Sequence, residues 1–168
     1  MKKGFTMIEL IFVIVILGIL AAVAIPKLAA TRDDAKAASI KTDIGTAEQA
    51  IPAWFQGQKE ASFLNAMSLD TSVWEEQNGT TGCGYVYKDD VGDTVTMTLK
   101  AADINTTSGV VTDKTTQPLC DANASSMGSA PYLSIKLNPN NGTGIVGQLG
   151  QMGVKDINIS LGGHKVKF

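Results

Sequence analysis

The hydrophobic pattern separates an unbroken apolar stretch near the N-terminus from a polar-rich remainder. Residues 10–25 carry no polar side chain. The 21 residues from Phe5 to Ile25 would form about 31 Å of helix, enough to cross a hydrocarbon core of roughly 30 Å. Because the stretch is apolar on every face, it predicts a membrane-spanning helix and argues against a helix buried in a soluble core.

After Pro26 the pattern becomes that of an amphipathic helix. Residues 29–38 are rich in alanine, a strong helix former, and include a polar face. The next apolar positions recur every three or four residues and form one stripe: Ile40, Ile44, Ala47 and Ile51. We expect this stripe to dock on a globular domain, and we expect Pro52 to end or bend the helix.

The rest of the chain favours short strands separated by turns. Residues 53–67 are interpreted as a second helix or helical loop, 145–152 as a short helix, and 105–131 as mostly loop. Residues 68–84 contain the turn signal Asn78-Gly79 but no clear period. The strand candidates share β-type residue patterns: 85–87, 94–99, 132–137, 157–161 and 165–168. The predicted fold is α+β, with one long N-terminal helix packed on an antiparallel sheet of four or five strands.

Composition limits the chemistry. The net charge of −2, without a basic stripe, argues against nucleic-acid binding. His164 is the single histidine, and with two cysteines it cannot build a structural zinc site unless carboxylates contribute. No activated nucleophile can be assembled from this inventory. We therefore expect neither an enzyme nor a resident cofactor.

Two local patterns suggest ligand chemistry but lack its context. Gly142 to Gly147 matches G-x-G-x-x-G, yet no strand with an acid about 20 residues later follows, so a glycine turn opening a short helix is favoured. Asp89, Asp90 and Asp93 could suggest calcium. The twelfth position of an EF-hand would fall on Lys100 and not on glutamate. A solvated hairpin turn is the favoured interpretation, with calcium as the weaker alternative.

Glu9 lies inside the apolar stretch, where an acid costs roughly 2.5–3.5 kcal/mol at mid-bilayer. This cost argues against an ordinary cleaved signal peptide, which would be cut after residues 22–24 and leave Ile25 at the start of a secreted soluble binding module. If the chain were instead cut after Gly4, Glu9 would lie one turn from the new α-amine of Phe5. The helix dipole favours an acid there by about 0.3–1 kcal/mol.

Residues 3–10, Lys-Gly-Phe-Thr-Met-Ile-Glu-Leu, followed by the apolar run and Pro26, resemble the class III signal of type IV pilins and type II secretion pseudopilins. The resemblance covers roughly residues 1–50. It implies four segments in chain order: a leader over 1–4, a transmembrane and filament-core helix over 5–25, its amphipathic continuation over 26–52, and a globular head domain over 53–168.

The resemblance also implies partners and residue roles. A membrane-embedded prepilin peptidase is expected to cut between Gly4 and Phe5 and to methylate the new amine. Glu9 is expected to pair with that amine on an adjacent subunit. The other implied partners are copies of the chain, related pilin-like subunits, an inner-membrane assembly platform and membrane lipid. The head domain would lie in the periplasm and later in a filament, either a pilus or a secretion pseudopilus.

Gly18 and Pro26 bracket the outer half of the apolar run. Proline removes a backbone donor, and glycine weakens a helix by about 1 kcal/mol relative to alanine. Two outcomes remain open. Either the helix simply kinks here, or the segment melts and stretches during packing, as in related filaments.

The two cysteines are expected to pair, because the implied periplasmic location permits disulfides. A Cys83–Cys120 bond would close a loop of about 37 residues and contribute perhaps 3–4 kcal/mol. The match to type IV pilins, which often carry a disulfide near the C-terminus, is loose here because 48 residues follow Cys120.

Four asparagines, each followed by a hydroxyl residue two places on, also have an acid two places before them: Asn78, Asn105, Asn123 and Asn158. This arrangement resembles the extended acceptor of bacterial N-glycosylation. Loops rich in Ser, Thr and Asn also produce such matches by chance, so the sequence leaves both explanations open.

Overall fold

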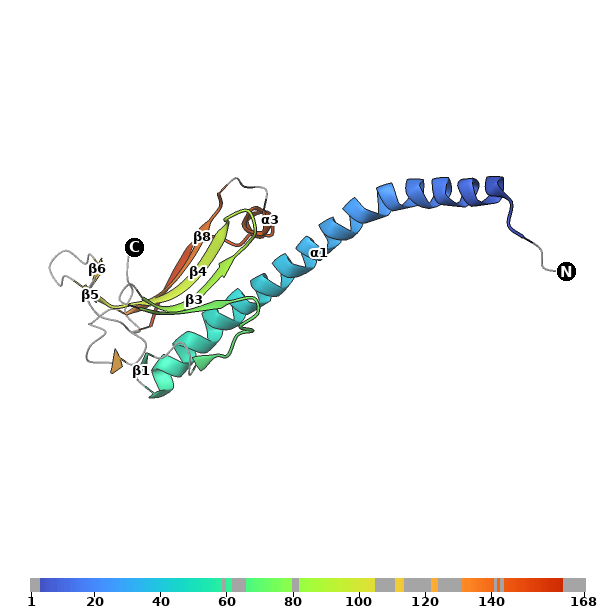
Figure 1. Cartoon of the computed structure of the whole chain (residues 1–168). Helices are drawn as coiled ribbons and strands as arrows, with labels where there is room; N and C mark the ends of the chain where they lie inside the picture. Colours follow the sequence, from blue (N-terminus) through green and yellow to red (C-terminus); the bar gives the residue numbers. More distant parts are fainter. Residues whose placement is uncertain are drawn as a thin grey trace. The chain divides into compact units, whose positions relative to one another are not determined.

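A computed structural model describes residues 4–58, 60–61, 66–79, 82–104, 111–113, 122–123, 131–140, 142 and 144–161 (Figure 1). It has two compact units, Met1–Lys36 and Ala37–Phe168. Helix α1 (Met7–Gln58) continues from the first unit into the second. The second unit combines the end of this helix with an antiparallel sheet, which confirms the predicted α+β class.

The main sheet has five strands in the order β2-β3-β4-β8-β9, all antiparallel. Their bounds are β2 Glu75–Gly79, β3 Gly82–Lys88, β4 Thr94–Lys100, β8 Tyr132–Asn138 and β9 Ile157–Ser160. Two small pairs join β1 (Glu60–Ala61) to β7 (Ala122–Asn123) and β5 (Ala102–Ile104) to β6 (Val111–Asp113). A short helix, α3 (Ile145–Gln151), lies between β8 and β9 in the chain.

The strand register places apolar side chains on one face of the sheet. Along β4 the apolar residues are buried while the threonines between them are half-buried, the period of two that a pleated strand imposes. The residues aligned across β3, β4 and β8 form three rows: Cys83, Leu99 and Leu133; Tyr85, Met97 and Ile135; Tyr87, Val95 and Leu137. These rows belong to the core cluster or pack against it.

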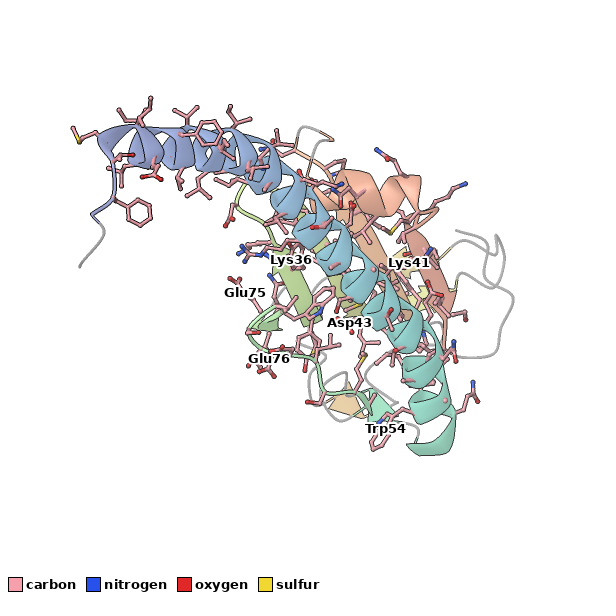
Figure 2. The ribbon with its side chains drawn as sticks, turned by 90° about the vertical axis from the view of Figure 1, so that its right-hand side faces the viewer. Lys36, Lys41, Asp43, Trp54, Glu75 and Glu76 are labelled. Atoms are coloured by element: carbon pink, nitrogen blue, oxygen red, sulfur yellow. The ribbon has the colours of Figure 1, made fainter. Side chains whose placement is uncertain are left out.

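The second half of α1 covers this apolar face (Figure 1). The stripe predicted from the sequence is buried as expected: Ile40, Ile44, Ala47 and Ile51 are each at most 2% exposed. Polar contacts flank the stripe. The indole Nε1 of Trp74 donates to Oδ2 of Asp43 at 2.8 Å, and Nζ of Lys41 donates to the carbonyl of Met152 at 2.9 Å; both helix residues are labelled in Figure 2.

Of the two predicted effects of Pro52, ending or bending the helix, the first is wrong, because α1 continues to Gln58. A proline inside a helix costs about 3 kcal/mol or more. Tertiary contacts beyond it offset that cost: Phe55 packs against the core, and Nε2 of Gln56 donates to the carbonyl of Leu161 at 2.9 Å. Residues 53–58, predicted to start a second helix or helical loop, belong to α1 instead, and much of the remainder up to residue 67 lies outside the described residues.

Several strand predictions are confirmed, and two segments differ from expectation. The strands at 85–87, 94–99, 132–137 and 157–161 and the short helix near 145–152 are found with small shifts of their ends. Strand β2 was not predicted, and short strands β6 and β7 occur within 105–131. The final strand predicted at 165–168 lies outside the described residues.

Replacing Ile44 by alanine tests the docking of α1 on the sheet. The side chain is 2% exposed within the core, so Ile44→Ala is expected to lower the free energy of unfolding by about 2–5 kcal/mol. Denaturant unfolding of the full chain in detergent measures this. The matched control is Thr46→Ala, on an exposed position of the same helix, which is expected to change stability little. Equal effects of the two variants would contradict the docking role.

Candidate functional site: the start of helix α1

The predicted cleavage site lies just before the first helical turn. Gly4 and Phe5 are outside regular secondary structure and exposed, with 84% of Phe5 accessible. Helix α1 begins two residues after Phe5, at Met7. A peptidase that must reach the backbone between residues 4 and 5 therefore meets an accessible segment outside regular secondary structure.

Thr6 and Glu9 form a capping box at the helix start. Oε2 of Glu9 accepts hydrogen bonds from the backbone N–H of Thr6 at 3.0 Å and from its hydroxyl at 2.6 Å. The N–H of Glu9 in turn lies 3.4 Å from Oγ1 of Thr6. In this arrangement the residue before the helix and the third helical residue satisfy each other's free donors.

The structure thus gives Thr6 a role that the sequence interpretation missed. The signal was present as Thr-x-x-Glu directly before an apolar run, which is the sequence signature of a capping box. The carboxylate of Glu9, predicted to act between subunits, also has a partner within its own chain. All the atoms of this capping box lie after the predicted cut, so cleavage would leave them in place.

The apolar stretch is exposed throughout. Helix α1 contains a window with mean hydropathy 3.1, none of it buried, and is the one helix in the described part of the chain long and apolar enough to cross a membrane. Its large side chains from Met7 to Leu28 are 40–79% exposed. An exposed apolar surface of this size is unfavourable in water. It is typical of a helix that is covered by lipid or by other apolar helices.

Gly18 and Pro26 lie within α1, which stays helical across both. A Cβ at Gly18 would meet no atom within 4 Å, so packing inside the chain does not require glycine there. A kink at these residues and melting of the segment during packing both stay predictions.

Two aspartates organise the turn between β3 and β4. Oδ1 of Asp89 accepts hydrogen bonds from the N–H groups of Val91 at 3.0 Å and Asp93 at 2.8 Å. Asp93 is fully buried, and its Oδ1 accepts a bond from the N–H of Asn140 at 2.6 Å. The prediction of a hairpin turn is confirmed, but the prediction that it is solvated is wrong for Asp93.

The same two carboxylates converge next to Gly144. A Cβ on Gly144 would lie 2.6 Å from Oδ2 of both Asp89 and Asp93, so a larger residue there would force these carboxylates to move. Asp90 is exposed. Within the described ranges no three His, Cys, Asp or Glu side chains gather at one point. Calcium at this turn stays a prediction, with two of its three proposed ligands near each other.

The glycine-rich segment before α3 behaves as a turn. Gly142 has a φ of +71°, and α3 follows from Ile145 with Gly144 as its N-cap. This confirms the interpretation as a glycine turn that opens a short helix.

Two groups in the second unit have shifted pKa values with structural causes. Hydrogen bonds from the hydroxyl and the N–H of Ser72 lower the pKa of Asp70, so this turn contact stabilises the fold near neutral pH and is lost as pH falls through that lowered pKa. Burial, with a smaller contribution from the charge of Glu76, raises the pKa of Tyr85, and a hydrogen bond involving the backbone of Leu69 opposes the shift.

The cysteines can be placed only in part. Cys83 is buried in β3, whereas Cys120 lies outside the described residues, as does His164. The disulfide between the two cysteines stays a prediction.

Thr6→Ala tests the capping box. Losing an N-cap side chain costs about 0.5–2 kcal/mol, so the amides of the first helical turn should exchange with solvent faster, by roughly 2- to 30-fold. Hydrogen exchange of the full chain in detergent measures this. Thr6→Ser retains the hydroxyl and is the matched control. Unchanged exchange in Thr6→Ala would show that the capping box does not hold the helix start.

Comparison with known proteins agrees with the geometry of the helix start. No curated protein and no solved structure matches the chain. A family model described as the prokaryotic N-terminal methylation motif matches residues 1–25. The segment that contains Gly4, Phe5, the capping box and the apolar run up to Ile25 is therefore the class III prepilin signal found in type IV pilin-like and pseudopilin precursors.

Proposed function

We propose that this chain is a structural subunit of a type IV pilus or a type II secretion pseudopilus. The observation that carries the proposal is the N-terminal methylation motif over residues 1–25. In this proposal prepilin peptidase cuts after Gly4 and methylates Phe5, and the mature chain stays in the inner membrane through residues 5–25. An assembly platform then adds it to a helical filament of identical and related subunits.

The charge pattern supports an outward orientation of the head domain. The leader carries Lys2 and Lys3, and basic residues next to a membrane span are held on the cytoplasmic side. The chain after the span would then lie in the periplasm, where a Cys83–Cys120 bond would persist.

The helix start supports a role for Glu9 between subunits. Both bonds from Thr6 go to Oε2 of Glu9, and its Oε1 accepts no hydrogen bond from the described part of the chain. The carboxylate can therefore keep its cap while Oε1 accepts the methylated amine of Phe5 from a neighbouring subunit. A charge-assisted bond of this kind in lipid is stronger than a neutral one.

The N-terminal peptide of the envelope protein tests the processing step. We expect mass spectrometry to find a mature chain that begins at methylated Phe5. In Gly4→Leu we expect residues 1–4 to be retained, because only glycine lets a backbone approach so closely without a Cβ. A mature chain beginning at Ile25 would instead indicate an ordinary signal peptide and a secreted protein, and would overturn the proposal.

Glu9→Leu tests the assembly role. Membrane insertion should become easier, by up to the roughly 2.5–3.5 kcal/mol that an acid costs, and processing should continue because Gly4 and Phe5 remain. Filament formation should fail, because an uncompensated buried charge typically costs about 3–5 kcal/mol. Filament yield by sedimentation, with processed monomer in the membrane fraction, measures both effects.

Glu9→Gln separates the two roles of this side chain. Glutamine can complete a capping box but carries no charge. If the charge acts between subunits, both variants fail to assemble, while only Glu9→Leu loosens the helix start. Normal filament yield from Glu9→Gln would show that Glu9 serves only as a cap.

A further inference from the structure

Asparagines followed two positions later by Ser or Thr occur five times in the chain: Asn78, Asn105, Asn123, Asn141 and Asn158. All except Asn141 also have Asp or Glu two positions before them, and none has proline on either side of the asparagine. Since 16 of the 168 residues are acidic, chance would place an acid before about one in ten of these asparagines. A composition rich in Ser, Thr and Asn explains the hydroxyls but not the acids.

This pattern of acid, asparagine and hydroxyl at alternate positions resembles the extended acceptor of bacterial N-glycosylation. We propose that the chain carries N-linked glycans at its acid-preceded asparagines, and that Asn158 is the site whose features the structure describes in full. This inference rests on the proposed function in one respect, because the transfer takes place on the outer side of the inner membrane.

Asn158 is placed where a glycan fits the folded protein. It is exposed and lies on β9, which among the described strands pairs with β8 alone, where it faces Ser134 in the register. Its neighbours Ile157 and Ile159 point to the opposite face, and Ile159 packs against the core. A bulky group on the nitrogen of Asn158 therefore reaches solvent without displacing any core residue.

The hydroxyl of Ser160 has no evident role in the folded protein. Its Oγ is shielded from solvent and makes no hydrogen bond with the described part of the chain. A buried hydroxyl without a partner destabilises a fold, so alanine would suit this position better. The acceptor pattern accounts for the hydroxyl, because a transferase requires Ser or Thr two positions after the modified asparagine.

The same contacts indicate when transfer takes place. Oδ1 of Asp156 accepts a hydrogen bond from the N–H of Leu137 at 2.8 Å, and the N–H of Leu161 donates to the carbonyl of Pro131 at 2.9 Å. In the folded protein the acid is therefore engaged and the hydroxyl of Ser160 is covered. A transferase must bind the segment while it is extended, before β9 adds to β8.

The placement also gives the glycans a physical role. Asn78 lies on β2, which with β9 forms the two outer strands of the sheet as far as the described residues go. Edge strands present unpaired backbone groups that can join another sheet, and proteins commonly block them. A glycan at each edge would prevent sheet-to-sheet association of subunits that accumulate at high local concentration in a membrane.

The reaction needs one co-reactant, a polyprenyl-diphosphate-linked oligosaccharide, and a membrane oligosaccharyltransferase. The Nδ2 of asparagine attacks the anomeric carbon of the first sugar and forms a C–N bond. The bond between that carbon and the diphosphate oxygen breaks, and the polyprenyl diphosphate leaves. One proton passes from Nδ2 to a base of the transferase.

The experiment uses the full chain isolated from the envelope of its own bacterium. Intact mass and peptide mapping should find sugar on the peptide that contains Asn158, and none on the peptide that contains Asn141. Ser160→Ala should abolish the sugar at Asn158 and leave the melting temperature of the protein unchanged or raised. Ser160→Thr should keep the sugar.

Asp156→Asn tests the acid separately, because asparagine keeps an oxygen that can accept the bond from Leu137 while it removes the charge. We expect occupancy at Asn158 to fall at least tenfold. An unmodified mass of the wild-type protein, or equal occupancy at Asn141 and Asn158, would overturn the proposal.

The N-terminal peptide from the same sample distinguishes the two proposals. Methylated Phe5 without any sugar would overturn glycosylation and leave the filament function intact. Sugar at Asn158 on a chain that begins at Ile25 would overturn the filament function and support glycosylation.

Discussion

The packing of one helix stripe against one sheet face is the contact on which the second unit depends. Four residues of α1 are almost fully buried in the core: Ile40, Ile44, Ala47 and Ile51. Their spacing presents a single face to the sheet, and the strand register supplies three rows of apolar side chains to meet it. Hydrogen bonds at the margins, such as the one from Trp74 to Asp43, fix how the helix is oriented on the sheet. The free energy of the contact comes mainly from the burial of apolar side chains.

A second constraint acts at the other end of the same helix. A carboxylate in an apolar segment must find hydrogen-bond donors, because lipid offers none. Thr6 supplies two of them to Glu9. A chain with this arrangement can keep an acid in an apolar, membrane-length segment at reduced cost, and Oε1 of the acid remains able to accept a bond from a cation.

Predictability varied with the physical basis of each feature. The helix, its buried stripe and the strands with alternating apolar residues follow from side-chain periodicity, which the sequence displays directly. Strand β2, Glu-Glu-Gln-Asn-Gly, has no such period because its described side chains are exposed and it is held by backbone bonds to β3. The cleavage motif could be identified from the sequence. The sequence also contained the signature of a capping box, but the bonds between Thr6 and Glu9 were recognised only in the structure.

The sequence by itself determined where an apolar helix begins, which of its residues face a core, and where the N-terminal methylation motif lies. These depend on residues near one another in the chain. Tertiary structure decided that α1 continues through Pro52, that Asp93 is buried against Asn140, and that the carboxylates of Asp89 and Asp93 crowd the position of Gly144. Each of these is settled by contact with residues distant in sequence, whose packing free energy outweighs the local preference.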